Sequence, residues 1–128
     1  MRLLLDTQIV IWAATEDPRL SLSARMSIGD PNAQVTFSVV TVWEVAIKFA
    51  LVRPDFRYSA AALRNGALRA SWQELGVSGE HAIAVADLPL IHGDPFDRLL
   101  VAQAQVEGIT LLTADKTLGQ YGSHVRVV

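Results

Sequence analysis

Two short apolar runs, far apart in the sequence, each lead directly to an aspartate. The first is Leu3–Leu5, followed by Asp6, and the second is Ile109–Thr113, with Asp115 two residues after its end. A strand that is buried on both faces is a continuous apolar run, not an alternation of apolar and polar residues. The two runs therefore predict central strands of a parallel sheet. Ligands bind such sheets just beyond the carboxyl ends of the strands, where these acids stand.

Segments with strand and helix patterns alternate along the chain. Further strands are expected at Val35–Ser38, Trp72–Val77 and Val125–Val128. Helices are expected at Thr7–Ala14, from a Ser21 or Ser23 cap to Ile28, and at Thr41–Leu51, Ser59–Ala70, Gly79–Asp87 and Asp94–Glu107. A short helix or a turn is expected at Lys116–Tyr121. This alternation predicts an α/β fold in which helices cover both faces of a parallel sheet.

The bulk composition fits one globular domain. The chain has 128 residues and 51% hydrophobic content, which is ample for a single core. A mean hydropathy of +0.29 indicates that part of the surface is an interface. No apolar stretch is long enough to cross a bilayer, and no signal-peptide core is present. The absence of cysteine excludes disulfides and thiolate sites, so a cytoplasmic location is expected.

Positive charge is concentrated in one segment. Although the net charge is −2, five bases and a single acid lie between residues 48 and 69. A protein held to nucleic acid by bulk charge would be basic overall, which this one is not. The segment is either a local surface for a polyanion or an ordinary solvated helix face. Its bases are Lys48, Arg53, Arg57, Arg64 and Arg69.

Acids also stand near the starts of two expected helices. Glu44 lies in the first turn of one, and Asp94 and Asp97 lie at the start of another. Helix starts that follow parallel strands share an edge with the strand ends, so these acids would meet Asp6 and Asp115 there. Clustered carboxylates raise one another's pKa, and a divalent cation with oxygen ligands offsets their repulsion. The group predicts a Mg²⁺ or Mn²⁺ site for phosphoryl transfer or phosphodiester hydrolysis.

Each acid taken alone also has a structural explanation. Asp6 can cap the following helix, and Asp94 before Pro95 is a favourable helix start. Glu44 and Lys48 are spaced as an ion pair on one helix face. Capping, however, does not require several acids to gather at one sheet edge, so the whole group favours the metal site.

The other chemical motifs are missing. The chain has no glycine-rich phosphate loop, and its three histidines lack the spacing of a zinc site. His92 lies close to Asp94, which leaves open that it lines the pocket, although a loop histidine more often faces solvent.

Four segments resemble PIN-domain ribonucleases of the VapC toxin type. They are Leu4–Thr7, Ser38–Lys48, His92–Ala104 and Leu112–Asp115, in the expected order and at the expected separations. The WEVAIK and DPFDR stretches within them are the most specific. The resemblance implies a single PIN domain over residues 1–128. It also implies a three-layer α/β/α PIN-like fold whose central parallel sheet has the strand order 3-2-1-4-5.

The same resemblance implies a function. It implies cleavage of RNA with Mg²⁺, for which Mn²⁺ would substitute, by a cytoplasmic homodimer that a cognate antitoxin inhibits. The family's catalytic acids fall on Asp6, Glu44, Asp97 and Asp115, of which Asp6, Asp97 and Asp115 would hold the metal. Thr7, Asp94 and Thr113 match supporting residues, and the five bases of residues 48–69 are candidate RNA contacts.

A second hypothesis assigns the chain to another class of protein. In this hypothesis, the chain is a non-catalytic PIN-like interaction module whose acids are helix caps and whose apolar surface binds a partner protein. The two hypotheses differ in one measurable property, which is whether a divalent ion binds the acids.

Overall fold

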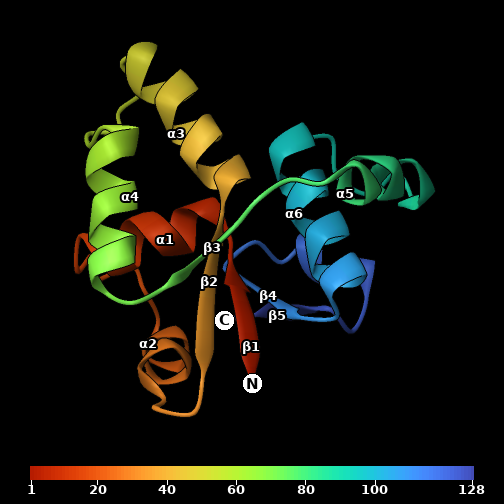
Figure 1. Cartoon of the computed structure of the whole chain (residues 1–128), viewed down its shortest axis with the longest axis horizontal. Helices are drawn as coiled ribbons and strands as arrows, with labels where there is room; N and C mark the ends of the chain where they lie inside the picture. The colour runs from red at the N-terminus through yellow and green to blue at the C-terminus, as the bar shows by residue number, and fades with distance from the viewer.

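A five-stranded parallel sheet runs through the middle of the computed structural model, which describes residues 1–128 (Figure 1). Its strand order is β3-β2-β1-β4-β5, and every neighbouring pair is parallel. The order places β1 and β4 side by side, so the expected order 3-2-1-4-5 is confirmed. The strands are β1 (Arg2–Leu5), β2 (Gln34–Ser38), β3 (Gln73–Leu75), β4 (Thr110–Thr113) and β5 (Val125–Val127).

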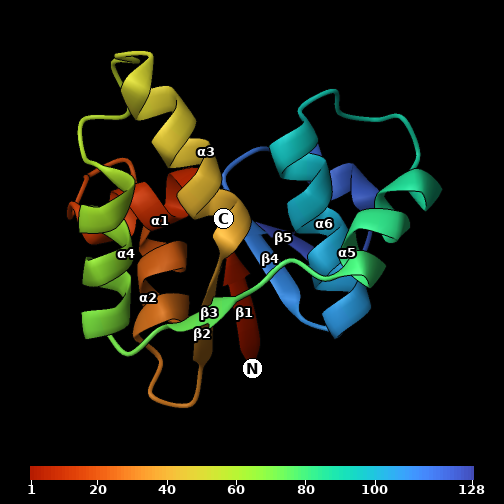
Figure 2. The ribbon, with the colours of Figure 1, turned by 45° about the horizontal axis from the view of Figure 1, so that its top comes forward.

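Helices cover both faces of this sheet, which confirms the three-layer α/β/α arrangement (Figures 1 and 2). None of them is both long and apolar enough to span a membrane. The helices are α1 (Thr7–Ala14), α2 (Leu22–Gly29), α3 (Val39–Ala50), α4 (Ala60–Arg69), α5 (Gly79–Ala84) and α6 (Pro95–Glu107). Two short 3₁₀ helices are η1 (Val85–Asp87) and η2 (Leu118–Tyr121).

The apolar run of β1 supplies both halves of the core. Because successive side chains of a strand point to opposite faces, Leu3 and Leu5 face one side of the sheet and Leu4 the other. Leu3 and Leu5 pack with α1, α2 and α4, whereas Leu4 packs with the start of α3 and with α6. All three leucines are fully buried, as the unbroken apolar run predicts.

The helix and strand bounds differ from the expected ones at a few ends. The helix α3 begins at Val39 instead of Thr41, because Ser38 caps it by accepting a hydrogen bond from the Val40 N–H at 3.0 Å. The strand β3 is short and exposed, as an edge strand is. The helix expected over Gly79–Asp87 divides into α5 and the 3₁₀ helix η1.

Several chain segments meet at the carboxyl edge of the sheet. There β1 ends one residue before Asp6 and β4 ends two residues before Asp115, while α3 and α6 both begin nearby. Figure 1 shows α3 continuing beyond this edge, opposite the start of α6. The fold therefore places acids from both halves of the sequence around one opening.

Candidate metal centre

A cavity of about 340 Å³ opens at the carboxyl edge of β1 and β4. All five predicted acids line it, although they come from the ends of two strands and from two helices. Its only basic lining residue is Lys48. The acids are Asp6, Glu44, Asp94, Asp97 and Asp115, and the other lining residues are Thr7, Gln8, Trp12 and Ala114.

Asp6 both caps α1 and faces this cavity. Its Oδ1 accepts a hydrogen bond from the Ile9 N–H at 2.9 Å, and its Oδ2 accepts one from the Thr113 hydroxyl. Burial raises the pKa of Asp6 to about 6, and the negative charges of Glu44 and Asp115 raise it further. The two hydrogen bonds act in the opposite direction and lower this pKa. Asp6 therefore caps a helix and also belongs to the acidic group of the cavity.

Asp97 is placed by the N-terminal turn of α6. Asp94 caps this helix, with its Oδ1 accepting hydrogen bonds from the N–H groups of Phe96 and Asp97 at 2.8 and 3.1 Å. Burial raises the pKa of Asp97 to about 7, and repulsion from Asp94, Asp6 and Glu44 contributes. Ionisation of Asp97 is therefore unfavourable when no cation is bound nearby.

Glu44 is buried on α3 and is held from two sides. The Thr7 hydroxyl donates a hydrogen bond to Oε1 at 2.7 Å, and Lys48 Nζ lies 2.5 Å from Oε2. The Lys48 ammonium also lies over the rings of Phe56 and Phe96, at 5.1 and 5.6 Å from their centroids. The charge of Lys48 is therefore fixed at the wall of the cavity.

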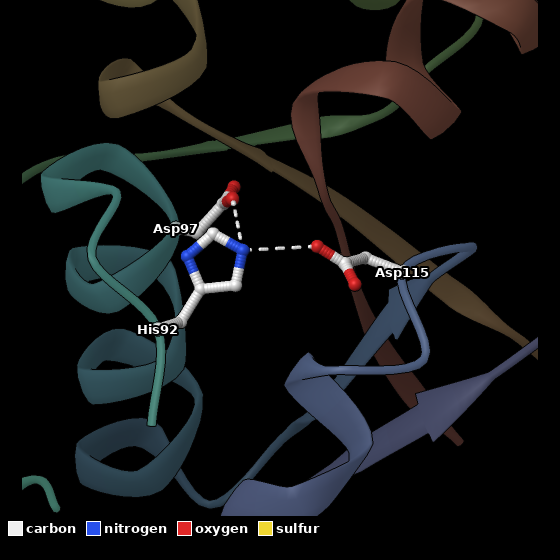
Figure 3. A group of neighbouring side chains, drawn as sticks. All are labelled: His92, Asp97 and Asp115. Carbon is white, nitrogen blue, oxygen red and sulfur yellow. Dashed lines mark hydrogen bonds and ion pairs between the residues drawn. The ribbon is translucent and has the colours of Figure 1, made fainter. Parts of the chain in front are cut away.

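Asp115 contacts His92, whose side chain points into the acidic group (Figure 3). His92 Nε2 lies 3.0 Å from Asp115 Oδ2 and 3.7 Å from Asp97 Oδ2. Asp115 Oδ1 accepts a hydrogen bond from the Thr117 N–H at 2.9 Å. The sequence favoured a solvent-facing His92 over one beside the pocket acids, and the structure shows the second position, with only 21% of the side chain exposed. Its closeness to Asp94 in the sequence was the only signal of this position.

The five bases of residues 48–69 do not act as one group. Lys48 lines the acidic cavity, whereas Arg64 is paired with Glu74 at 2.5 Å. Arg53 and Arg57 line a separate hollow beyond the end of α3. Arg69 ends α4, which leads back to the amino edge of the sheet before β3 begins. The structure therefore brings only Lys48 of this set to the acids.

The chemistry of the lining residues fits a hard divalent cation. Carboxylate oxygens predominate, and burial and nearby carboxylates raise the pKa values of Asp6 and Asp97, an effect that a bound cation would oppose. Oxygen-rich sites of this type suit Mg²⁺ and Mn²⁺. One oxygen each from Asp97 and Asp115, with a ring nitrogen of His92, also lie within 4.8 Å of one another.

The same fold occurs in solved toxin–antitoxin complexes. VapBC2 of Rickettsia felis, bound to a promoter DNA fragment, has a TM-score of 0.72 at 17% identity, covering 100% of this chain and 98% of that one. DNA-bound VapBC of Salmonella typhimurium has a TM-score of 0.67 at 17% identity, with coverage of 100% and 97%. A toxin–antitoxin complex of Klebsiella pneumoniae has a TM-score of 0.65 at 19% identity, with coverage of 97% and 95%.

At these identities the likeness shows a common fold. Comparison with curated proteins gives no match. The family model of the PIN domain, in contrast, matches residues 3–123, a range that holds all six α-helices and every acid of the cavity and ends before β5. The chain belongs to the PIN-domain family.

Proposed function

We propose that this protein is a metal-dependent endoribonuclease and the toxin of a toxin–antitoxin pair. The observation that carries the proposal is the convergence of five carboxylates on one cavity whose only basic lining residue is Lys48. In this proposal residues 1–128 form one PIN domain, which acts in the cytoplasm. The occurrence of the same fold in VapBC complexes supports it.

Asp6, Asp97 and Asp115 would hold the metal, with Mg²⁺ as the ion and Mn²⁺ as its substitute. When bound, such an ion supplies positive charge that activates water and stabilises a leaving oxygen. Thr113 and the Ile9 N–H orient Asp6, and the Asp94 cap places Asp97. These supporting contacts fix the acids before substrate arrives.

Asp115 is better placed than Glu44 to accept the proton of the attacking water. The side chain of Glu44 is only 6% exposed, and its carboxylate is paired with the Lys48 ammonium at 2.5 Å. The side chain of Asp115 is 40% exposed at the rim of the cavity. Attack by water on the phosphodiester would leave a 5′-phosphate and a 3′-hydroxyl. Glu44 would then anchor Lys48 and add negative charge near the metal.

Lys48 would contact a phosphate of a single-stranded or looped RNA. It is the basic residue at the cavity wall, and phosphate contacts of this kind position nucleic acid without reading its sequence. Arg53 and Arg57, beyond the end of α3, would extend this path. Arg64 and Arg69 are less suited to it, because one is paired with Glu74 and the other lies at the far end of α4.

The exposed apolar surface supports protein partners. Val39, Trp43 and Ile47 follow one another at four-residue intervals along α3 and are 37%, 56% and 36% exposed. Such a stripe is expected to be covered in a complex. We infer a homodimer and a cognate antitoxin as the partners. Light scattering of the protein alone and with its antitoxin would measure both associations.

Cleavage of RNA by an Asp97→Asn variant tests the proposal directly. We expect the wild-type protein to cleave a labelled single-stranded RNA with Mg²⁺ or Mn²⁺ and to stop when the metal is chelated. Asp97→Asn should fold normally and lose cleavage. Asp87→Asn, at an exposed aspartate of η1 outside the cavity, is the matched control and should cleave like the wild type.

Two results would contradict the proposal. Full metal-dependent cleavage by purified Asp97→Asn would exclude this acidic group as the active site. A wild-type protein that neither cleaves RNA nor responds to Mn²⁺ would favour the non-catalytic interaction module.

A further inference from the structure

His92 lies between two acids that belong to different parts of the fold. Asp97 stands in the first turn of α6, and Asp115 follows β4 (Figure 3). The Nε2 atom of His92 faces both, at 3.7 and 3.0 Å. This placement allows two roles, in which Nε2 is either a ligand of the metal or a hydrogen-bond donor to Asp115.

The hydrogen bond on the other ring nitrogen decides between these roles. The backbone N–H of Asp94 lies 3.1 Å from His92 Nδ1 and donates to it. An amide N–H is always a donor, so Nδ1 must offer its lone pair. In a neutral imidazole the second nitrogen then carries the hydrogen, which makes Nε2 a donor. A nitrogen that carries a hydrogen is not free to bind a metal.

The loop that carries His92 is also fixed in place. Tyr121 Oη accepts a hydrogen bond from the His92 N–H at 3.0 Å and another from Arg98 Nη1 at 3.1 Å. Arg98 also donates to the carbonyl oxygens of Pro89 and Val85, at 3.0 and 3.2 Å. Turning the ring over would bring a carbon atom towards the Asp94 N–H, so this tautomer is tied to the loop conformation.

We propose that His92 is a positioning residue of the metal centre that acts through Asp115 and is not a metal ligand. Its Nε2–H holds Oδ2 of Asp115, while the Thr117 N–H holds Oδ1. Each carboxylate oxygen keeps a further lone pair for the ion, and the carboxylate cannot turn away from Asp97. Hydrogen bonds of this kind orient metal-binding carboxylates in many proteins.

The tautomer can be measured in the metal-free protein. Long-range ¹H–¹⁵N correlation spectra distinguish a protonated ring nitrogen from an unprotonated one, and the signals of His92 are those missing from a His92→Gln variant. In the pH range where the ring is neutral we expect hydrogen on Nε2 and none on Nδ1. Hydrogen on Nδ1 would overturn the inference and leave Nε2 available as a ligand.

Metal binding tests the positioning role, which rests on the proposed function. His92→Ala should weaken Mn²⁺ binding by roughly 10- to 100-fold, as loss of a supporting hydrogen bond does at other metal sites. His92→Gln should recover most of the affinity, because its amide places an N–H close to the position of Nε2. His124→Gln, a histidine outside the cavity, is the control and should bind Mn²⁺ like the wild type. Wild-type affinity in His92→Ala, or no recovery in His92→Gln, would overturn the inference.

Electron spin echo spectra of the Mn²⁺-loaded protein separate a donor from a ligand. We expect no coupling of Mn²⁺ to a directly bound imidazole nitrogen. Such a coupling in the wild type that disappears in His92→Gln would overturn the inference and assign His92 as a ligand. If the wild type binds no Mn²⁺ at all, the metal centre fails and the positioning role fails with it. The tautomer measurement still decides, on its own, whether Nε2 is a donor.

Discussion

The acids of the cavity carry negative charge that the folded protein accommodates poorly without a cation. The pKa of Asp97 is raised to about 7 and that of Asp6 to about 6, from an ordinary value of 3.8. Because the folded state holds these protons more tightly than the unfolded state, their contribution to stability is fully present below about pH 4. It is lost as the pH rises through 6 and 7.

Asp97→Asn should therefore stabilise the metal-free protein at alkaline pH. With a chelator present at pH 8, we expect its free energy of unfolding to exceed that of the wild type by on the order of 2 kcal/mol. Near pH 4 the difference should vanish, because protonated Asp97 and asparagine are both neutral. Urea unfolding at the two pH values measures this, and a wild type that is the more stable at pH 8 would contradict it.

The pair of Lys48 and Glu44 makes a different prediction. Lys48→Met leaves a buried carboxylate without its cation, which should lower the free energy of unfolding by on the order of 2 kcal/mol at pH 7. Adding Glu44→Gln should recover part of the loss, because no uncompensated charge is then buried. Urea unfolding of the four proteins of this double-mutant cycle measures the coupling. Independent, additive effects would show that the two side chains do not interact.

At the level of elements, the start of α6 determines where Asp97 stands. Asp94→Ala removes the cap and should cost about 1 kcal/mol of stability, whereas Asp94→Asn, which keeps an oxygen acceptor, should cost only a few tenths. Thermal unfolding of both variants measures the difference. Equal losses in the two variants would show that the charge of Asp94, and not its capping hydrogen bonds, supports the helix.

Most elements were predictable because their signals are local. The apolar runs of β1 and β4, the serine caps and the Asp94–Pro95 helix start need only a few neighbouring residues. The position of His92 depends on Tyr121, which is 29 residues away in the sequence. The loss of Arg64 from the expected basic group likewise depends on its pairing with Glu74 of β3. Tertiary contacts of this kind cannot be predicted from local sequence patterns. The strand order could not be predicted from such patterns either, and only the family resemblance implied it.

At the level of the whole molecule, the cavity joins the two halves of the core. Asp6 follows β1, whose alternate leucines serve both faces of the sheet, and Asp97 belongs to α6 on one face. Thr7, which contacts Glu44, begins α1 on the opposite face. A cation that binds Asp6, Asp97 and Asp115 together would therefore restrain elements of both layers at once.

Mn²⁺ should accordingly stabilise the entire fold. A ligand that binds only the folded state adds about 2.7 kcal/mol at 100 times its dissociation constant. In a domain of this size that corresponds to a rise in Tm on the order of 10 °C. Asp6→Asn should abolish most of the rise, and the control Asp87→Asn should keep it. Differential scanning fluorimetry measures all three proteins. If the acids only capped helices, Mn²⁺ would cause no specific rise in the Tm of the wild type. That result would favour the hypothesis of a non-catalytic interaction module.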